Sequence, residues 1–217
     1  MSDKNLITAH REQIISDNSD FLDNKLFLEF GVMEGESTIE YIQTFLAHNL
    51  SVHTYGFDSW HGLPEETNDP NNSRIWSEGK FSMHGKKPAH LLNRDDITLV
   101  DGYFSDSLQR PEVIEQLQNK PAGIIHLDCD IYTSTKEALE FCIKYDILVP
   151  RTIIVYDDWA GYLHNGLLDE YASGQGMCHK EIESEYNLEF EHIDRVVVNS
   201  SNRDGHIINV FRYIGQK

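Results

Sequence analysis

Five short apolar runs recur along the chain, and each ends at or beside an acidic residue. They cover residues 26–30, 52–58, 97–101, 122–128 and 152–157, and their acids are Glu29, Asp58, Asp101, Asp128 and Asp157. Helix-like patterns follow at 39–46, 111–117, 134–145 and 177–186. Strands alternating with helices predict an α/β fold with a doubly wound, mostly parallel sheet. Two C-terminal strands, at 188–198 and 206–214, are joined by a hairpin-type connection and add an antiparallel hairpin, giving seven strands.

The five acids share one expected location. Ligands of such sheets bind beyond the carboxyl ends of the parallel strands, where all five acids fall. Like charges are costly to crowd together unless a cation or a hydroxyl-rich ligand lies among them. The pattern therefore predicts a binding site for such a ligand at this edge of the sheet.

The first strand leads into a glycine turn. Residues 26–38 show the spacing Glu-x-Gly-x-x-x-Gly from Glu29, and Ser37 or Thr38 is then placed to cap a helix. Glycine lets a ligand approach where a Cβ would block it, and a helix start offers free N–H groups and a positive dipole end. The spacing differs from the G-x-G-x-x-G of dinucleotide-binding proteins, and the acid suits a cationic ligand better than a pyrophosphate. A plain strand-to-helix turn is the alternative interpretation of this stretch.

Composition narrows the class of protein. The 217 residues suit one large domain, residues 26–217, preceded by an extension, residues 1–25, that we interpret as a lid, an oligomer contact or a frayed terminus. Acids outnumber Lys and Arg by 36 to 18, which disfavours nucleic acid and anionic membranes as partners. The three cysteines form no C-x-x-C pair, and neither a signal peptide nor a membrane-spanning run is present. We therefore expect a cytoplasmic protein with reduced thiols.

Two groups of acids carry specific chemistry. A carboxylate at Asp58, the end of the second strand, can accept both hydroxyls of a ribose, although a solvated turn aspartate is the alternative. The pairs Asp128/Asp130 and Asp157/Asp158 follow successive strands and suit a hard cation such as Mg²⁺. Helix-cap and turn roles are the alternative for these four. The histidines form no zinc-binding array, and His126, inside a strand, is expected to be a hydrogen-bonded core residue.

Two long connections leave the same edge of the sheet. Residues 59–95 and 159–173 are therefore predicted to form lids over the site. Their tryptophans, Trp60, Trp76 and Trp159, either pack on a ligand or belong to the core.

Several motifs together resemble one family. Residues 57–65 read FDSWHGLPE, similar to the FDSFEGLPE stretch of the macrocin O-methyltransferase-like (TylF/MycF) family. The further matches are WSEGKF at 76–81, DGYFSDSL at 101–108, HLDCDIYTST at 126–135, the following Ala138-Leu139, and VYDDW at 155–159. The resemblance spans roughly residues 26–190. It departs from the family at Trp159, where tyrosine is usual, in the short N-terminal region and in residues 159–173.

The resemblance implies a class I methyltransferase fold, Rossmann-like, with S-adenosylmethionine and Mg²⁺ as cofactors. By position, Glu29, Gly31 and Gly35 would line the methionine part and Asp58 would hold the ribose. Near the adenine would lie Asp101, Gly102, Tyr103 and Phe104. Ser37, Ser59 and Asp128 complete the predicted cofactor set. Metal ligands would be Asp128, Asp157 and Asp158, with Asp130 a further candidate ligand or base. We predict Asp128 or Asp130 as the catalytic base, and a histidine near the rim, His61 or His164, is the alternative.

The predicted function is a magnesium-dependent O-methyltransferase that acts on a hydroxyl of a small molecule, such as a sugar or a sugar-bearing natural product. A catechol-like acceptor is an alternative. Two others are a nucleotide-sugar or NAD-dependent enzyme on the same sheet, and a non-catalytic module that keeps a nucleoside pocket. The partner is a hydroxylated small molecule, and the chain could also form a homo-oligomer.

Overall fold

The computed structural model describes residues 3–69, 71, 77–159, 170–199 and 205–217. In these residues seven strands form one sheet with the order β3-β2-β1-β4-β5-β7-β6. The strands are β1 (Leu26–Phe30), β2 (His53–Asp58), β3 (Ile97–Asp101), β4 (Ala122–Leu127), β5 (Ile153–Tyr156), β6 (Leu188–Asn199) and β7 (Gly205–Gln216). The first five are parallel, and β7 is antiparallel to both β5 and β6. The predicted fold, a mostly parallel seven-stranded α/β sheet with a C-terminal antiparallel pair, is confirmed.

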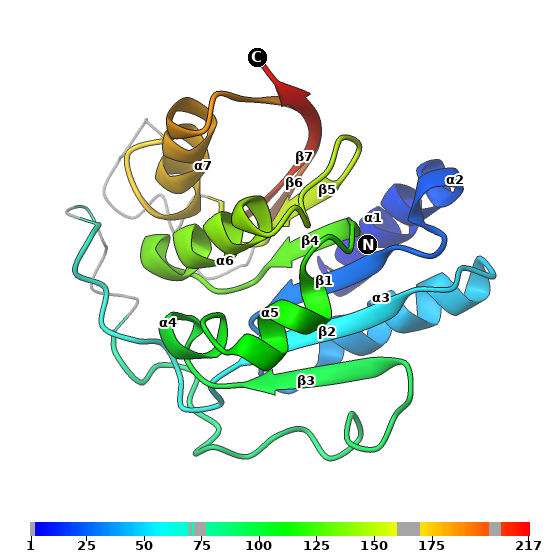
Figure 1. Cartoon of the computed structure of the whole chain (residues 1–217), viewed down its shortest axis with the longest axis horizontal. Helices are drawn as coiled ribbons and strands as arrows, with labels where there is room; N and C mark the ends of the chain where they lie inside the picture. The colour runs from blue at the N-terminus through cyan, green and yellow to red at the C-terminus, as the bar shows by residue number, and fades with distance from the viewer. Residues whose placement is uncertain (1–2, 70, 72–76, 160–169, 200–204) are drawn as a thin grey trace.

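Helices cover both faces of the sheet (Figure 1). They are α1 (Asp3–Asp17), α2 (Ser19–Leu22), α3 (Glu36–Ala47), α4 (Phe104–Ser107), α5 (Pro111–Leu117), α6 (Tyr132–Lys144) and α7 (Gly174–Glu185). Side chains alternate across a strand, so neighbours in β1 face opposite layers. Phe27 packs with Tyr41 of α3 and Ile15 of α1. Phe30 stacks on Phe57 in the core shared with α5, α6 and α7.

The start of α3 differs from the prediction. Its N-cap is Gly35, with φ +77° and no capping bond from a side chain, and neither Ser37 nor Thr38 is a cap. Both hydroxyls lie inside the first turn and donate hydrogen bonds to the Glu29 carboxylate of the adjoining strand. A buried carboxylate accepts these hydroxyls, so they are not used to satisfy the helix N–H groups.

Smaller differences concern boundaries. Helix α1 occupies much of the predicted N-terminal extension, and α6 and α7 begin before residues 134 and 177. The short helices α2 and α4 were not predicted. The middle of the predicted hairpin connection, residues 200–204, lies outside the described residues. Among the described residues, no helix combines the length and apolarity needed to cross a membrane.

The predicted lid between β2 and β3 folds back on itself. Trp60 O accepts the N–H groups of Met83 (3.1 Å) and Gly85 (2.8 Å). Further along, Leu63 donates to Lys80 O (3.0 Å) and accepts from the Gly79 N–H (2.9 Å). These bonds hold the two arms of the connection together beside the carboxyl end of β2.

Candidate active site

Two glycines shape the loop after β1. Gly31 has φ +95°, and a Cβ added there would lie 1.7 Å from the carbonyl oxygen of Asp128. Gly35 has φ +77°, and its Cβ would lie 2.5 Å from a methyl group of Leu91. Both positions therefore require glycine because protein atoms occupy the space, which adds a packing reason to the predicted access for a ligand.

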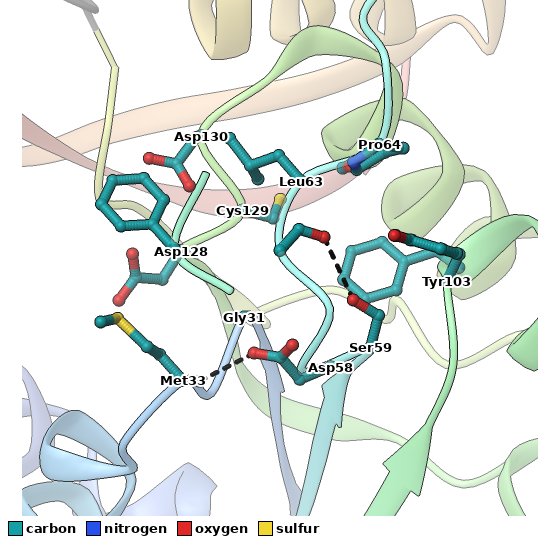
Figure 2. Close-up of a pocket in the computed structure, with 14 residues that line it drawn as sticks. Gly31, Met33, Asp58, Ser59, Leu63, Pro64, Tyr103, Asp128, Cys129 and Asp130 are labelled. Atoms are coloured by element: carbon teal, nitrogen blue, oxygen red, sulfur yellow. Dashed lines mark hydrogen bonds between the residues drawn. The ribbon is translucent and has the colours of Figure 1, made fainter. Parts of the chain in front are cut away.

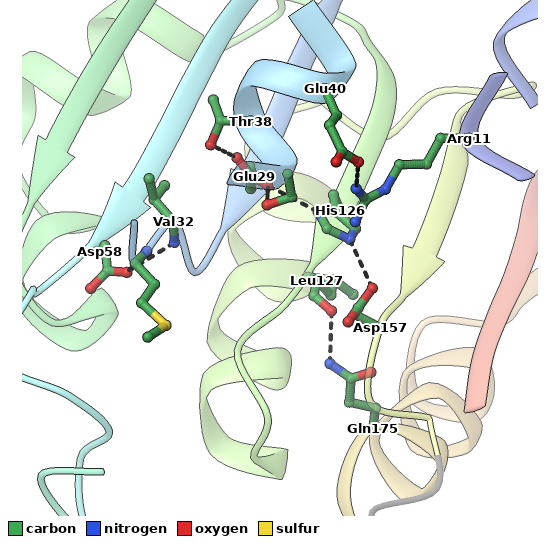
Figure 3. A network of polar contacts seen from close by, with 12 residues as sticks. Arg11, Glu29, Val32, Thr38, Glu40, Asp58, His126, Leu127, Asp157 and Gln175 are labelled. Atoms are coloured by element: carbon green, nitrogen blue, oxygen red, sulfur yellow. Dashed lines mark hydrogen bonds and ion pairs between the residues drawn. The ribbon is translucent and has the colours of Figure 1, made fainter. Parts of the chain in front are cut away.

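Asp58 lies where predicted, at the end of β2, and holds the glycine loop. Its Oδ2 accepts the backbone N–H groups of Val32 (2.9 Å) and Met33 (2.7 Å), and its Oδ1 accepts that of Trp60 (2.6 Å). Figures 2 and 3 show this carboxylate facing the loop. An ionised carboxylate has about four acceptor sites. The three bonds leave about one of them for a ligand hydroxyl.

A pocket opens between the ends of β1, β2 and β4 (Figure 2). Seven residues of the predicted cofactor and catalytic sets line it: Gly31, Asp58, Ser59, Tyr103, Phe104, Asp128 and Asp130. The sequence did not single out the apolar part of the wall, which includes Met33, Leu63, Pro64 and Phe81. Met33 and Phe81 are also exposed large apolar side chains, so they form the mouth of the pocket.

Two residues of the predicted adenine segment do not line this pocket. Asp101 is exposed and forms an ion pair with Lys87 (3.0 Å). Gly102, with φ +120°, packs against Arg110, whose guanidinium would lie 2.7 Å from a Cβ at this position. Their neighbours Tyr103 and Phe104 do face the pocket.

Glu29 is completely buried and belongs to a polar network behind the pocket (Figure 3). Its carboxylate accepts the Ser37 hydroxyl (2.6 Å) and lies 3.2 Å from Nδ1 of His126. The other ring nitrogen, Nε2, lies 3.4 Å from Oδ1 of Asp157. His126 is the hydrogen-bonded core residue that its strand position predicted.

In this network the neighbours of His126 favour its protonated form. Burial by itself would lower its pKa, but the Tyr41 hydroxyl and the carboxylates of Asp157 and Glu29 outweigh burial and raise the pKa well above its ordinary value. Both ring nitrogens then donate, one to each carboxylate. The imidazolium therefore links β1, β4 and the end of β5.

Asp128 and Asp157 meet beside this histidine. One ligand atom from each of the three residues lies within 4.8 Å of the others. Because the imidazole nitrogens face carboxylates, the oxygens of Asp128 and Asp157 are the donors left for a cation. Burial and the nearby charge of Asp157 raise the pKa of Asp128 well above its usual range. A hard divalent ion fits this oxygen set and would relieve the repulsion.

Asp158 and Asp130 lie around the pair. Asp158 is outside the described three-residue cluster; its backbone N–H donates to Gln175 (2.9 Å), whose amide donates to Leu127 O (3.0 Å). Asp130 has φ +61° and lines the pocket. Burial, followed by the charges of Asp158 and Asp128, raises the pKa of Asp130 well above its usual value.

Comparison with known proteins agrees with this arrangement. A family model described as "Methyltransferase domain" matches residues 28–159, more than half of the chain. The chain belongs to this family. A search of curated proteins finds no match.

The methyltransferase domain also resembles solved structures, at identities that show the fold alone. The O-methyltransferase NovP aligns with a TM-score of 0.61 and 16% identity over 96% of this chain and 79% of its own. An O-methyltransferase from Bacillus cereus in complex with S-adenosylhomocysteine has a TM-score of 0.54 and 17% identity over 94% and 80%. The O-methyltransferase TomG from Streptomyces achromogenes, in complex with S-adenosylmethionine, gives 0.53 and 11% over 95% and 80%.

In the methyltransferase domain, the connection after β2 is attached to two helix starts. Glu66 accepts the N–H (2.7 Å) and hydroxyl (2.8 Å) of Thr133 in the first turn of α6. Asp69 accepts the Gly174 N–H (2.8 Å) and the Ser173 hydroxyl (2.9 Å) at the start of α7. A carboxylate at a helix start accepts hydrogen bonds from the free N–H groups and interacts favourably with the positive end of the helix dipole. This attachment carries the connection across the carboxyl ends of β4 and β5.

The tryptophans of the two predicted lids were expected either to pack on a ligand or to belong to the core, and the two described ones have different surroundings. Trp60 is buried, and its indole N–H donates to Met33 O (3.1 Å), so it supports the pocket mouth. Trp159 is buried in an aromatic cluster with Tyr156 and Phe211. Trp76 and residues 160–169 of the second predicted lid lie outside the described residues.

Proposed function

We propose that the protein transfers a methyl group from S-adenosylmethionine to a hydroxyl of a small molecule with the help of Mg²⁺. The observation that carries the proposal is one pocket bounded by the β2 carboxylate of Asp58 and by Asp128 and Asp130 after β4, with Asp157 beside Asp128. The first residue suits a ribose, and the others suit a cation and a proton acceptor. The family match supports the reaction class, as does the similarity to the O-methyltransferases NovP and TomG.

Different residues of the pocket would bind or shield different parts of the cofactor. Asp58 would hold the ribose with its remaining acceptor capacity while it fixes the loop that carries Gly31. S-adenosylmethionine, when bound, supplies an electrophilic methyl group on a positively charged sulfur. The apolar side chains of Met33 and Phe81 at the mouth would exclude water from that group.

The acceptor hydroxyl needs a base and a charge nearby. Asp128 and Asp157 would hold Mg²⁺, which when bound supplies positive charge that lowers the pKa of an acceptor hydroxyl. Asp130 is then the better candidate for the base, because it lines the pocket and is not one of the residues that would hold the ion. Holding donor and acceptor in one pocket supplies the alignment that methyl transfer needs.

The acceptor class is proposed from the motif resemblance. The HLDCDIYTST and FDSWHGLPE stretches are similar to those of the macrocin O-methyltransferase-like family, which favours a sugar or a sugar-bearing natural product. A hydroxylated ring also suits the mixed pocket wall, in which the apolar Leu63 and Pro64 share the lining with Asp130 (Figure 2).

The test combines binding and turnover. Calorimetry should show binding of S-adenosylhomocysteine both in excess EDTA and in Mg²⁺. Methyl transfer from labelled S-adenosylmethionine, measured on a panel of sugar, catechol and amine acceptors, should require Mg²⁺ and a hydroxyl. Asp157→Asn should reduce turnover strongly and leave S-adenosylhomocysteine affinity within about twofold, while Glu189→Gln, on exposed β6, should change neither. Full turnover by metal-free enzyme would refute the metal role, and binding without turnover on any acceptor would favour the non-catalytic module.

A further inference from the structure

A second cavity adjoins the pocket on the side of helix α1. Its walls include Gly35 and Ser37 at the start of α3, Ile7 and Arg11 of α1, and Met33 and Asp128, which also line the first pocket. The two cavities therefore meet at Met33 and Asp128. A ligand that lies along Gly31 in the first pocket can extend into the second.

Arg11 is the basic side chain in the wall of this cavity. Its guanidinium Nη1 donates to Oε2 of Glu40 (2.6 Å), and its Cζ lies 5.1 Å from the centre of the Tyr41 ring. The Arg11 side chain is only 11% exposed. Figure 3 shows it reaching from α1 toward Glu40 on α3. The bond to Glu40 uses one of the five N–H donors of a guanidinium, which can bind a second carboxylate with the others.

The wall of the cavity carries one cation, Arg11, and four acids, Glu34, Glu36, Glu40 and Asp128, of which Glu40 is paired with Arg11. Arg11 and the first turn of α3, next to Gly35, favour a carboxylate. Asp128 and Glu34, on the same wall, favour an ammonium. An α-amino acid presents both charges on neighbouring atoms. In S-adenosylmethionine this zwitterion is the end of the molecule opposite the adenine.

We propose that Arg11 binds the α-carboxylate of the methionine part of S-adenosylmethionine, so that helix α1 completes the cofactor site. The proposal rests on the proposed function, because it assigns a subsite of the same ligand. It gives residues 1–25 a binding role: α1 closes the far end of the pocket and supplies its cation.

The test compares two ligands that differ only at this end. S-adenosylhomocysteine carries the amino-acid group, whereas 5′-methylthioadenosine has the same adenine, ribose and sulfur without it. Arg11→Met should weaken S-adenosylhomocysteine binding roughly 10- to 100-fold, the range expected for a lost charge-assisted bond, and change methylthioadenosine binding less than about twofold. Arg11→Lys keeps the charge and should recover part of the affinity. Calorimetry on the full chain measures both ligands.

Arg151 provides the matched control. It also pairs with an acid, Asp20 (2.7 Å), and lies over an aromatic ring, Phe21 (4.8 Å), but beside the start of β5. Arg151→Met should leave both affinities unchanged. Equal losses for the two ligands in Arg11→Met, or no loss for either, would overturn the proposal. Failure of the wild-type protein to bind either ligand would instead refute the proposed function, so the two failures are distinguishable.

Discussion

Replacing Asp58 with asparagine tests whether this carboxylate holds the glycine loop. The native side chain accepts three backbone N–H groups, two on Oδ2 and one on Oδ1. Asparagine keeps the shape but turns one oxygen into an NH₂ group. In its best orientation the amide oxygen accepts the N–H groups of Val32 and Met33. The NH₂ group then faces the N–H of Trp60, and two donors cannot form a hydrogen bond with each other.

The cost is therefore at least one charge-assisted hydrogen bond, about 1.5–3 kcal/mol of unfolding free energy. For a chain of this size each kcal/mol lowers the melting temperature by about 2–4 °C, so Asp58→Asn should melt roughly 3–12 °C below the wild type. Circular dichroism without ligand measures the shift, and Asp95→Asn, at an exposed position before β3, is the control. A melting temperature within about 1 °C of wild type would mean that the three bonds do not hold the loop, and would leave a ligand role alone for Asp58.

Three further changes follow from the described contacts. Gly31→Ala should cost more than about 4 kcal/mol or prevent folding, because its Cβ would meet the Asp128 carbonyl oxygen at 1.7 Å; soluble protein with wild-type urea unfolding would contradict this. Burial lowers the pKa of His179 to about 3, so the folded state binds fewer protons there than the unfolded state below pH 6.5, and stability falls as pH falls. Between pH 6 and 5 this histidine should cost about 1 kcal/mol, and His179→Gln should flatten the urea-measured slope by that amount; an unchanged slope would reject the assignment. Glu66→Gln with Asp69→Asn should speed proteolysis within residues 59–95, because two helix starts lose the acids that hold the connection; unchanged cleavage would show that the backbone pairing of its arms suffices.

The sheet was predictable because its signal is local. Each parallel strand is a short apolar run with an acid at its end, and the segments between them carry helical spacing or turn residues. The predicted capping of α3 was wrong because the role of the two hydroxyls depends on a residue in another element, Glu29 of β1. Ser37 and Thr38 have the right chemistry for caps, but the buried Glu29 carboxylate lies within reach of both hydroxyls and accepts them.

The residues of the candidate site were likewise predictable only where the signal is local to a strand end. Asp58, Asp128 and Asp130 were found because strand ends share one edge of the sheet, whichever loops follow. Arg11 comes from a helix before the first strand, and nothing in its local sequence indicates that it lines a cavity next to Asp128. Phe81 belongs to a connection that was predicted as a lid, but the sequence did not indicate which of its side chains would line the pocket. An arginine on a polar helix is usually exposed at the surface, so only the packing of α1 against α3 distinguishes Arg11.

The crowding of acids led us to predict a bound cation. Part of their negative charge is balanced by a basic residue of the protein, His126. His126 lies between Glu29 and Asp157, and its raised pKa favours a positive charge at this place in the sheet. It does not neutralise the cluster, because Asp128 and Asp130 still have raised pKa values, which trace first to burial and then to the charge of Asp157 for Asp128 and of Asp158 for Asp130. A protein that needed only stability would lose these acids at little cost, since replacing buried charges with apolar groups is often neutral or stabilising. Asp128 and Asp130 face the pocket where, in the proposed function, a cation and a sulfonium would lie. Binding of these positive charges would therefore offset the energetic cost of crowding the acids.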